Sequence, residues 1–131
     1  MKVSCALIIS DGTSIIAGRG TGKPDAKHSY DIAGKGCADQ GEEHIDAAVR
    51  ELREETGISL PSSAIRDIYD LGTHKYIAKK DLHVFLLKVD QLPSIDSLFC
   101  ESTFESYGRE LPELAGFKII SLSELDWLYP A

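Results

Sequence analysis

The stretch that decides the fold lies at residues 36–58 and reads GCADQGEEHIDAAVRELREETGI. From Glu43 to Thr56 its apolar residues recur at intervals of three and four, the spacing of one face of a helix. These residues are Ile45, Ala48, Val49 and Leu52. Gly57 follows at once and is placed to end the helix in a left-handed turn. We therefore expect a helix over 43–56 that packs its apolar stripe against a core.

A second face of this predicted helix is acidic. Each helical residue turns about 100°, so Glu51, Glu54 and Glu55 share one face. Carboxylates at this spacing repel one another, and a bound divalent cation turns that repulsion into ligation. Mg²⁺ suits such a site because it prefers oxygen ligands and bridges to phosphates. The same spacing also fits a solvated acidic face in which Arg50 pairs with Glu54, and spacing alone leaves both interpretations open.

The order of residues around the helix favours the metal site. Gly36, Glu42 and the run 50–58 match every fixed position of the Nudix signature, which spans 23 residues here. In this segment the chain resembles the Nudix hydrolase family. The resemblance implies an α/β fold, a Nudix-type α/β/α sandwich with a mixed sheet, in which the segment forms a catalytic loop-helix-loop.

The resemblance also implies a set of site residues. Glu51, Glu54 and Glu55, joined by the Gly36 carbonyl, occupy the positions of the family's metal ligands, with Mg²⁺ as the expected ion and Mn²⁺ as an alternative. Arg50 is expected to orient a carboxylate, so Glu51, Glu54 and Arg50 form the expected catalytic set. The expected reaction is attack of a metal-activated water on a pyrophosphate bond.

Other acidic residues are candidates for supporting roles. Glu42 holds the other acidic position of the motif and is expected to be an outer ligand or part of a charge network. Glu51 is the first candidate for the general base that takes the proton of water. The later-loop candidates, of which Glu113 is favoured, are Glu101, Glu105, Glu110 and Glu113.

Cationic residues before the motif are candidates for phosphate binding. Lys35, Arg19 and Lys23 are the expected substrate-binding residues, and Lys35 is the best placed in the sequence. A role as solvated surface residues remains open for all three. Many family members carry a proline two residues before the first glycine of the motif, whereas this chain has Gly34.

Outside the motif the sequence predicts a sheet. The apolar runs 3–9 and 13–17 flank Asp11-Gly12, a dipeptide typical of a tight hairpin. Residues 18–41 read as a long loop with a short strand near 30–32, and residues 91–116 read as irregular. The remaining predicted elements are a short turn at 61–65, strands at 68–76, 82–89 and 117–120, a turn at 78–81, and a short helix from a capping box at Ser121 to about Leu128.

Length and composition limit the number of domains, the partners and the cellular setting. The 131 residues fit a single domain over 1–131. A net charge of −7 argues against binding of long nucleic acid, and no apolar run is long enough for a membrane span. The three cysteines are widely separated and favour a reducing, cytoplasmic setting. A monomer and a homodimer both remain open.

These features lead to a ranked set of functions. The leading one is hydrolysis of a nucleoside diphosphate linked to another moiety X, so that a small nucleotide-like substrate is the expected partner. Alternatives of the same class are a nucleoside triphosphate pyrophosphatase and a diadenosine polyphosphate hydrolase. The alternative from another class is a non-catalytic nucleotide-sensing domain, which predicts a degraded motif, whereas all three helical glutamates are present.

Overall fold

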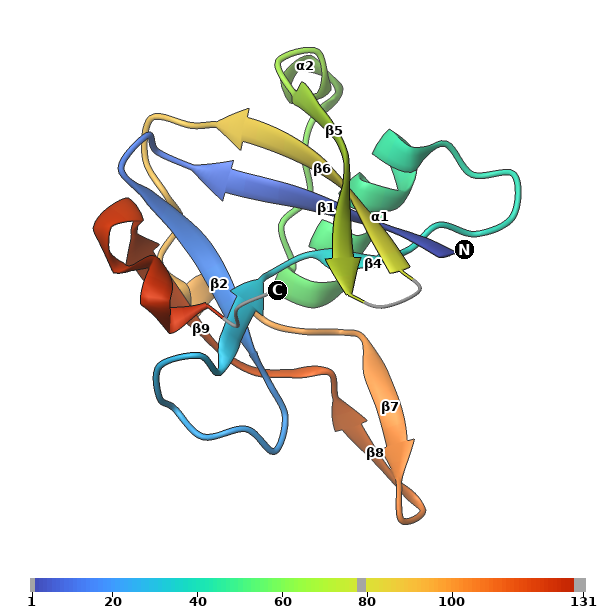
Figure 1. The fold of residues 1–131 in the computed structure, drawn as a ribbon, viewed down its shortest axis with the longest axis vertical. Coiled ribbons are helices and arrows are strands. Elements are labelled where there is room, and N and C mark those ends of the chain that lie inside the picture. Colours follow the sequence, from blue (N-terminus) through green and yellow to red (C-terminus); the bar gives the residue numbers. More distant parts are fainter. Residues whose placement is uncertain (1, 78–79, 129–131) are drawn as a thin grey trace.

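The computed structural model describes residues 2–77 and 80–128. Figure 1 shows a twisted sheet with helix α1 (His44–Thr56) lying across one of its faces. The sheet has seven strands. They are β1 (Lys2–Ser10), β2 (Ser14–Gly20), β3 (Tyr30–Ile32), β4 (Lys35–Cys37), β5 (Tyr69–Ile77), β6 (Lys80–Lys88) and β9 (Leu114–Ser121).

The sheet is mixed because β1 and β6 run parallel, whereas its other pairs are antiparallel. β1 meets β2 only beside their connecting turn, where Ser10 lies opposite Ile15. Farther along, β1 pairs with β4, and β2 pairs with β3 and β9. The predicted hairpin turn is present, since Asp11 Oδ1 accepts hydrogen bonds from the backbone N–H groups of Thr13 and Ser14. This topology places β4, at the start of the motif, directly beside β1.

The core lies on both faces of the sheet because side chains alternate along each strand. On one face, Leu7 and neighbouring strand residues pack against Leu52 and the small alanines of α1. On the other face, Tyr30 and Ile120 pack with Trp127 of the 3₁₀ helix η2 (Leu122–Trp127). The prediction of a sandwich with a mixed sheet is confirmed, with η2 forming the second outer layer.

Helix α1 is the element that the sequence predicted best. It begins one residue later than expected, and the backbone N–H of Gly57, at φ 79°, donates to the Arg53 carbonyl. The predicted apolar stripe packs in the core, with Ala48 and Leu52 buried and Ile45 and Val49 partly buried. Local periodicity was sufficient here because the helix presents one continuous face to the sheet.

Two regions that the sequence predicted as loops contain strands. Residues 18–41 include β4 as well as the expected β3. The prediction of an irregular segment at 91–116 was wrong, because it contains η1 (Ile95–Ser97), a two-stranded hairpin of β7 (Thr103–Ser106) and β8 (Arg109–Pro112), and the start of β9. The hairpin projects from the body of the molecule (Figure 1). It buries little, so it has no alternating apolar pattern that sequence analysis detects.

Smaller differences concern turns. The break at 61–65 contains the short helix α2 (Ser62–Ile65). In the predicted turn 78–81, Lys80 and Asp81 belong to β6, and residues 78–79 lie outside the described residues. Ser121 caps η2 by accepting from the Ser123 N–H, in place of the expected capping box. Among the described residues, no helix is long and apolar enough to span a membrane.

Candidate active site

Helix α1 turns two of its glutamates toward the interior. Glu51 and Glu55 retain only 8% and 5% of their accessible surface, whereas Glu54 is partly exposed. A solvated acidic face would leave all three carboxylates in water. The buried pair therefore favours the alternative in which these carboxylates bind a cation.

Glu55 is fixed by the turn between β3 and β4. Its Oε1 accepts hydrogen bonds from the backbone N–H groups of Gly34, at 2.9 Å, and Lys35, at 3.1 Å. Burial raises the pKa of Glu55 to about 7, although the two N–H groups and the positive charge of Lys35 oppose the rise. Glu55 is thus a buried, oriented carboxyl whose negative charge is costly without a nearby cation.

Glu51 lies against the backbone of Gly36. A Cβ atom at Gly36 would overlap the Glu51 carboxylate, so only glycine permits this approach. Burial raises the pKa of Glu51, the charges of Glu54 and Glu113 add to the rise, and Arg50 opposes it. The first glycine of the motif thus lets its backbone lie beside the carboxylate of the expected ligand Glu51.

Arg50 links the acidic residues of the motif. Its Nε and Nη2 donate to the two carboxylate oxygens of Glu42, each at 3.0 Å, and Nη2 also donates to the Cys37 carbonyl at 3.0 Å. Its Nη1 donates to Glu51 Oε1 at 2.9 Å and to Glu54 Oε2 at 3.2 Å. The hydrogen bond from Arg50 is the main reason that the pKa of Glu42 is lowered. Of the two roles expected for Glu42, this arrangement matches the charge network.

The donor set fits a divalent cation in the chemistry of its groups. Carboxylate oxygens and a carbonyl are the ligands that Mg²⁺ and Mn²⁺ prefer. Within residues 2–77 and 80–128, no three His, Cys, Asp or Glu side chains are close enough together to hold an ion. The positive Arg50 guanidinium bridges Glu51 and Glu54 in this arrangement. Joint ligation by the three glutamates therefore requires their carboxylates to move from this arrangement.

Gly34 explains why this chain departs from the proline found in many family members. Its φ is 81°, a left-handed conformation that proline does not adopt. A Cβ atom at this position would lie 2.9 Å from the Leu52 Cα. Glycine thus lets the β3–β4 turn pass close to α1, and this passage brings the Gly34 N–H to Glu55.

A cavity of about 400 Å³ opens next to Glu55. It brings together the expected residues Lys23, Lys35 and Glu113 with Glu55. Lys35 Nζ also lies 3.7 Å from Asp31 Oδ2. The full lining is Gly18, Gly20, Lys23, Ser29, Tyr30, Asp31, Ile32, Lys35, Glu55, Glu113 and Leu114.

Other sequence candidates lie elsewhere. Arg19 does not line this cavity, and its Nη1 donates to the Lys23 carbonyl at 2.8 Å, so it holds the turn that carries Lys23. The backbone N–H of Glu101 donates to the Glu54 carbonyl at 2.6 Å. Glu105 and Glu110 face each other across the exposed β7–β8 hairpin. Glu113 is the one later-loop candidate among the residues that line the cavity.

Sequence reasoning missed the wall of the cavity formed by residues 29–32. Tyr30 is buried, and its hydroxyl donates to Asp25 Oδ1 at 2.7 Å. The sequence predicted only a short strand near residues 30–32 at this place. An aromatic flanked by aspartates in a glycine-rich segment is the one signal in the sequence for this wall.

The fold and site define an α/β sandwich whose helix α1 carries buried carboxylates, one of which lines a cavity together with lysines. The sequence pattern described as NUDIX domain matches residues 1–128. The chain therefore belongs to the NUDIX domain family, which confirms the resemblance and the predicted fold. No match is found among the curated proteins.

Solved structures of this fold include three proteins that are complexed with, or named for, nucleotides. One is a bifunctional NMN adenylyltransferase/ADP ribose pyrophosphatase from Francisella tularensis, complexed with AMP and an Mn ion. It aligns with a TM-score of 0.65 and 20% sequence identity, and the alignment covers 97% of this chain and 37% of the Francisella chain. An Ap4A hydrolase binary complex from C. elegans aligns with TM-score 0.64 and 19% identity over 96% of this chain and 85% of its own.

The third is the NUDIX domain of Shewanella oneidensis NrtR complexed with ADP ribose, with TM-score 0.63 and 12% identity over 95% of this chain and 75% of its own. The chain spans only 35% to 43% of the length of three solved chains that it matches, among them the Francisella protein. At these identities the likeness shows the fold.

Proposed function

We propose that this chain is a divalent-metal-dependent hydrolase that cleaves a pyrophosphate bond in a nucleoside diphosphate linked to another moiety X. The observation that carries the proposal is the burial of Glu51 and Glu55 beside a 400 Å³ cavity that Lys23 and Lys35 line. Cavities of this size accept small ligands, and lysines beside carboxylates suit a phosphate that a metal bridges. Membership of the NUDIX domain family supports the same reaction class.

The chain's own residues have distinct parts in this proposal. Glu51, Glu54, Glu55 and the Gly36 carbonyl would hold Mg²⁺ or Mn²⁺, which when bound neutralises phosphate oxygens and lowers the pKa of a bound water. Arg50 orients Glu51 through its hydrogen bond to Oε1. A carboxylate near this site then takes the proton of the attacking water.

Two residues compete for the role of general base. Glu51 is favoured because its carboxylate lies against the Gly36 backbone within the acidic motif and is oriented by Arg50 Nη1. Glu113 is the second candidate because it lines the cavity and its charge acts on Glu51. Solvent-isotope effects and pH–rate profiles of Glu51→Gln and Glu113→Gln distinguish the two candidates. The variant that lacks the general base is expected to lose the fall in rate at acid pH, and the other variant is expected to keep it.

Phosphate binding is assigned to Lys35 and Lys23. Both line the cavity, and Lys35 directly follows the turn that binds Glu55. Arg19 is proposed to support Lys23 through its backbone and not to contact substrate. Lys35→Gln is expected to raise KM for the substrate about tenfold or more, since it removes a charged phosphate contact.

The cavity and the solved relatives support a nucleotide as substrate. The relatives are complexed with, or named for, AMP, ADP ribose and Ap4A, all adenosine phosphates. A nucleoside triphosphate and a diadenosine polyphosphate remain the alternatives of the same class. Product analysis on a panel of nucleoside triphosphates, dinucleoside polyphosphates, ADP-ribose and nucleotide sugars with Mg²⁺ ranks them.

The same panel tests whether the chain is an enzyme. Glu54→Gln and Glu55→Gln are each expected to lower turnover by about two orders of magnitude or more with the fold intact. Asp46→Asn, which removes an exposed acid from the first turn of the same helix, is the matched control and retains turnover. Binding of these nucleotides without turnover would instead support a nucleotide-sensing domain.

We further propose that residues 1–131 act as a single domain in the cytoplasm on a small nucleotide-like substrate, without long nucleic acid or membrane as partner. The net charge of −7 and the cysteine pattern support this setting. Sedimentation of the protein at several concentrations separates a monomer from a homodimer.

A further inference from the structure

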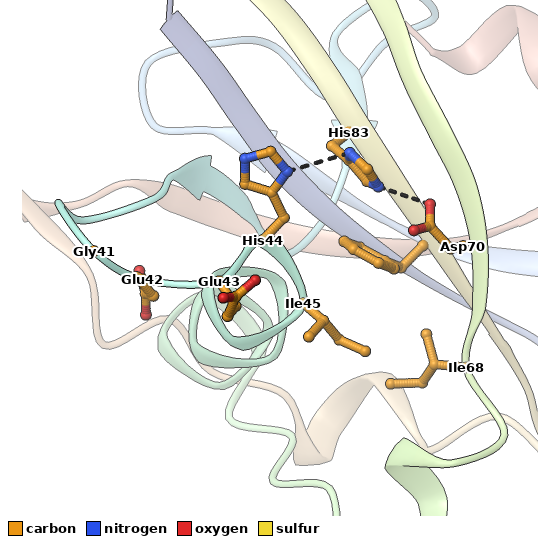
Figure 2. Close-up of a pocket in the computed structure, with 9 residues that line it drawn as sticks. Gly41, Glu42, Glu43, His44, Ile45, Ile68, Asp70 and His83 are labelled. Atoms are coloured by element: carbon orange, nitrogen blue, oxygen red, sulfur yellow. Dashed lines mark hydrogen bonds and ion pairs between the residues drawn. The ribbon is translucent and has the colours of Figure 1, made fainter.

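A second cavity, of about 570 Å³, opens between the first turn of α1 and strands β5 and β6. Figure 2 shows the helix nearly end-on, with side chains of its first turn and of the two strands around the space. The nine residues that line it are Gly41, Glu42, Glu43, His44, Ile45, Ile68, Asp70, His83 and Phe85. None of them lines the cavity beside Glu55.

A chain of hydrogen bonds fixes the two imidazoles of this cavity. His83 Nε2 lies 2.7 Å from Asp70 Oδ1, so this nitrogen carries a proton and donates to the carboxylate. In neutral His83 the other nitrogen, Nδ1, is then an acceptor. It receives the Thr73 hydroxyl at 2.8 Å and lies 3.3 Å from His44 Nδ1.

His44 lies against His83 at the N-terminal end of α1. Their Nδ1 atoms are 3.3 Å apart and their ring centroids are 5.0 Å apart, a contact that holds the His44 ring in place. In neutral His83 the one lone pair of Nδ1 accepts the Thr73 hydroxyl. A neutral His44 imidazole has one acceptor nitrogen of its own, which it can offer to a ligand.

The other side chains of the cavity are acceptors or apolar. Glu43 is exposed at the N-cap position and makes no capping hydrogen bond with its side chain, and the side chain of Asp70 is 60% exposed. Ile45 and Ile68 supply apolar walls. None of the nine lining residues is Lys or Arg. The acidic side chains of the lining therefore favour a ligand that donates hydrogen bonds and carries positive charge.

We infer that this cavity is a second ligand site, which binds a small organic cation: an amino or ammonium group carried on an apolar or aromatic body. The charged group lies among Glu43, Asp70 and His44, and the body lies against Ile45 and Ile68. The site is distinct from the cavity of the proposed reaction. His44 and Glu55 are separated by about 16 Å along the helix axis.

The site is connected to the acidic motif through Glu42. Glu42 lines the cavity and accepts both hydrogen bonds from Arg50, which in turn bridges Glu51 and Glu54. A cation in the cavity therefore lies next to the network that positions these carboxylates. This cation is either a free amine or an amino group at the far end of a substrate whose moiety X carries one.

The first experiment measures binding alone. Benzylamine, benzyl alcohol and benzoate share a ring and differ in charge, and each is titrated into the protein with saturating Mg²⁺ while the imidazole NMR signals of His44 and His83 are followed. Benzylamine is expected to shift both signals and to bind about fivefold or more tightly than benzyl alcohol. Benzoate is expected to leave them unchanged. Equal binding of the amine and the alcohol, or shifts caused by benzoate, would overturn the inference.

Variants test whether the named carboxylates carry the selectivity. Glu43→Gln removes a charge whose side chain makes no capping bond, so the fold is retained. Glu43→Gln combined with Asp70→Asn is expected to abolish the preference for benzylamine over benzyl alcohol. Asp46→Asn, also in the first turn of α1, is the control and keeps it. An unchanged preference in Glu43→Gln alone and in the double variant contradicts the inference.

A kinetic experiment distinguishes the two sources of the cation. This experiment rests on the proposed hydrolysis, whereas the NMR titration is independent of it. The compared substrates are ADP esterified with a long-chain amino alcohol and ADP esterified with the diol of the same chain length, because the amine must span the distance of about 16 Å between the sites. If the amine belongs to the substrate, Glu43→Gln raises KM for the first ester only. If it is a separate ligand, free benzylamine changes the turnover of both esters alike.

Discussion

Replacement of Glu55 by glutamine is expected to stabilise the metal-free protein at alkaline pH. Burial raises the pKa of Glu55 from its ordinary value of 4.5 to about 7 in the folded state. The folded state thus holds the proton more tightly than the unfolded chain. The stability that this carboxyl contributes is complete below pH 4.5, falls as the pH rises toward 7, and is lost above it. A shift of this size corresponds to about 3 kcal/mol.

Glutamine removes the charge and retains the local structure. Its carbonyl oxygen accepts the hydrogen bonds that Glu55 Oε1 receives from the N–H groups of Gly34 and Lys35. The variant therefore isolates the cost of the buried charge. Glu51, whose pKa is also raised by burial, is present in both proteins, so most of its effect cancels in the difference between them.

The assay is urea unfolding at pH 5 and pH 8 with EDTA present. Between these values the wild type is expected to lose up to about 3 kcal/mol more of its unfolding free energy than Glu55→Gln. Glu43→Gln, an exposed change next to α1, is the control and follows the wild type. Parallel pH curves for the wild type and Glu55→Gln would refute the reasoning, because they would mean that the carboxylate is not desolvated.

Three further variants or labels test other parts of the site. Arg50→Lys loses the two hydrogen bonds from Arg50 to Glu42 and is expected to lower the free energy of unfolding by about 1–2 kcal/mol, measured by urea unfolding at pH 7. An unchanged urea midpoint would mean that these contacts of Arg50 do not stabilise the fold. Gly34→Ala places a Cβ at positive φ against α1 and is expected to cost about 2 kcal/mol or more in the same assay; a neutral effect would contradict the close packing. Burial raises the pKa of Cys5 to about 11, whereas Cys37 is exposed. At pH 8 a thiol reagent is therefore expected to label Cys37 in the folded protein and Cys5 only after unfolding, and mass spectrometry of the labelled peptides measures both.

The sequence predicted the helix and the acidic motif because both depend on local order. Apolar spacing located α1 within one residue at its start, and Gly57 marked its end. The fixed positions of the motif indicated the expected ligands. The burial of Glu51 and Glu55 was not predictable in this way. It depends on the β3–β4 turn, whose residues 34–36 reach α1 across a long-range contact that helical periodicity does not encode.

The same limit applies to the elements outside the motif. The β7–β8 hairpin is exposed, so its strands lack the alternation that identifies buried strands. His44 and His83 showed no ligand spacing in the sequence, since 39 residues separate them. The packing of α1 on the sheet brings them together. Sequence patterns report what each segment buries, whereas contacts between segments require the topology.

The glycines and the buried glutamates act as one unit in this fold. Gly34 and Gly36 lack side chains, so the β3–β4 backbone approaches α1 closely enough to cover Glu51 and Glu55. That cover makes the negative charge of Glu55 unfavourable by about 3 kcal/mol above pH 7. A ligand that binds only the folded state, at a hundred times its Kd, contributes about 2.7 kcal/mol of stability. Mg²⁺ at a hundred times its Kd should therefore offset most of the free-energy cost of the Glu55 charge in the wild type at pH 8. It should stabilise Glu55→Gln much less, because the variant has lost both the buried charge and one expected ligand.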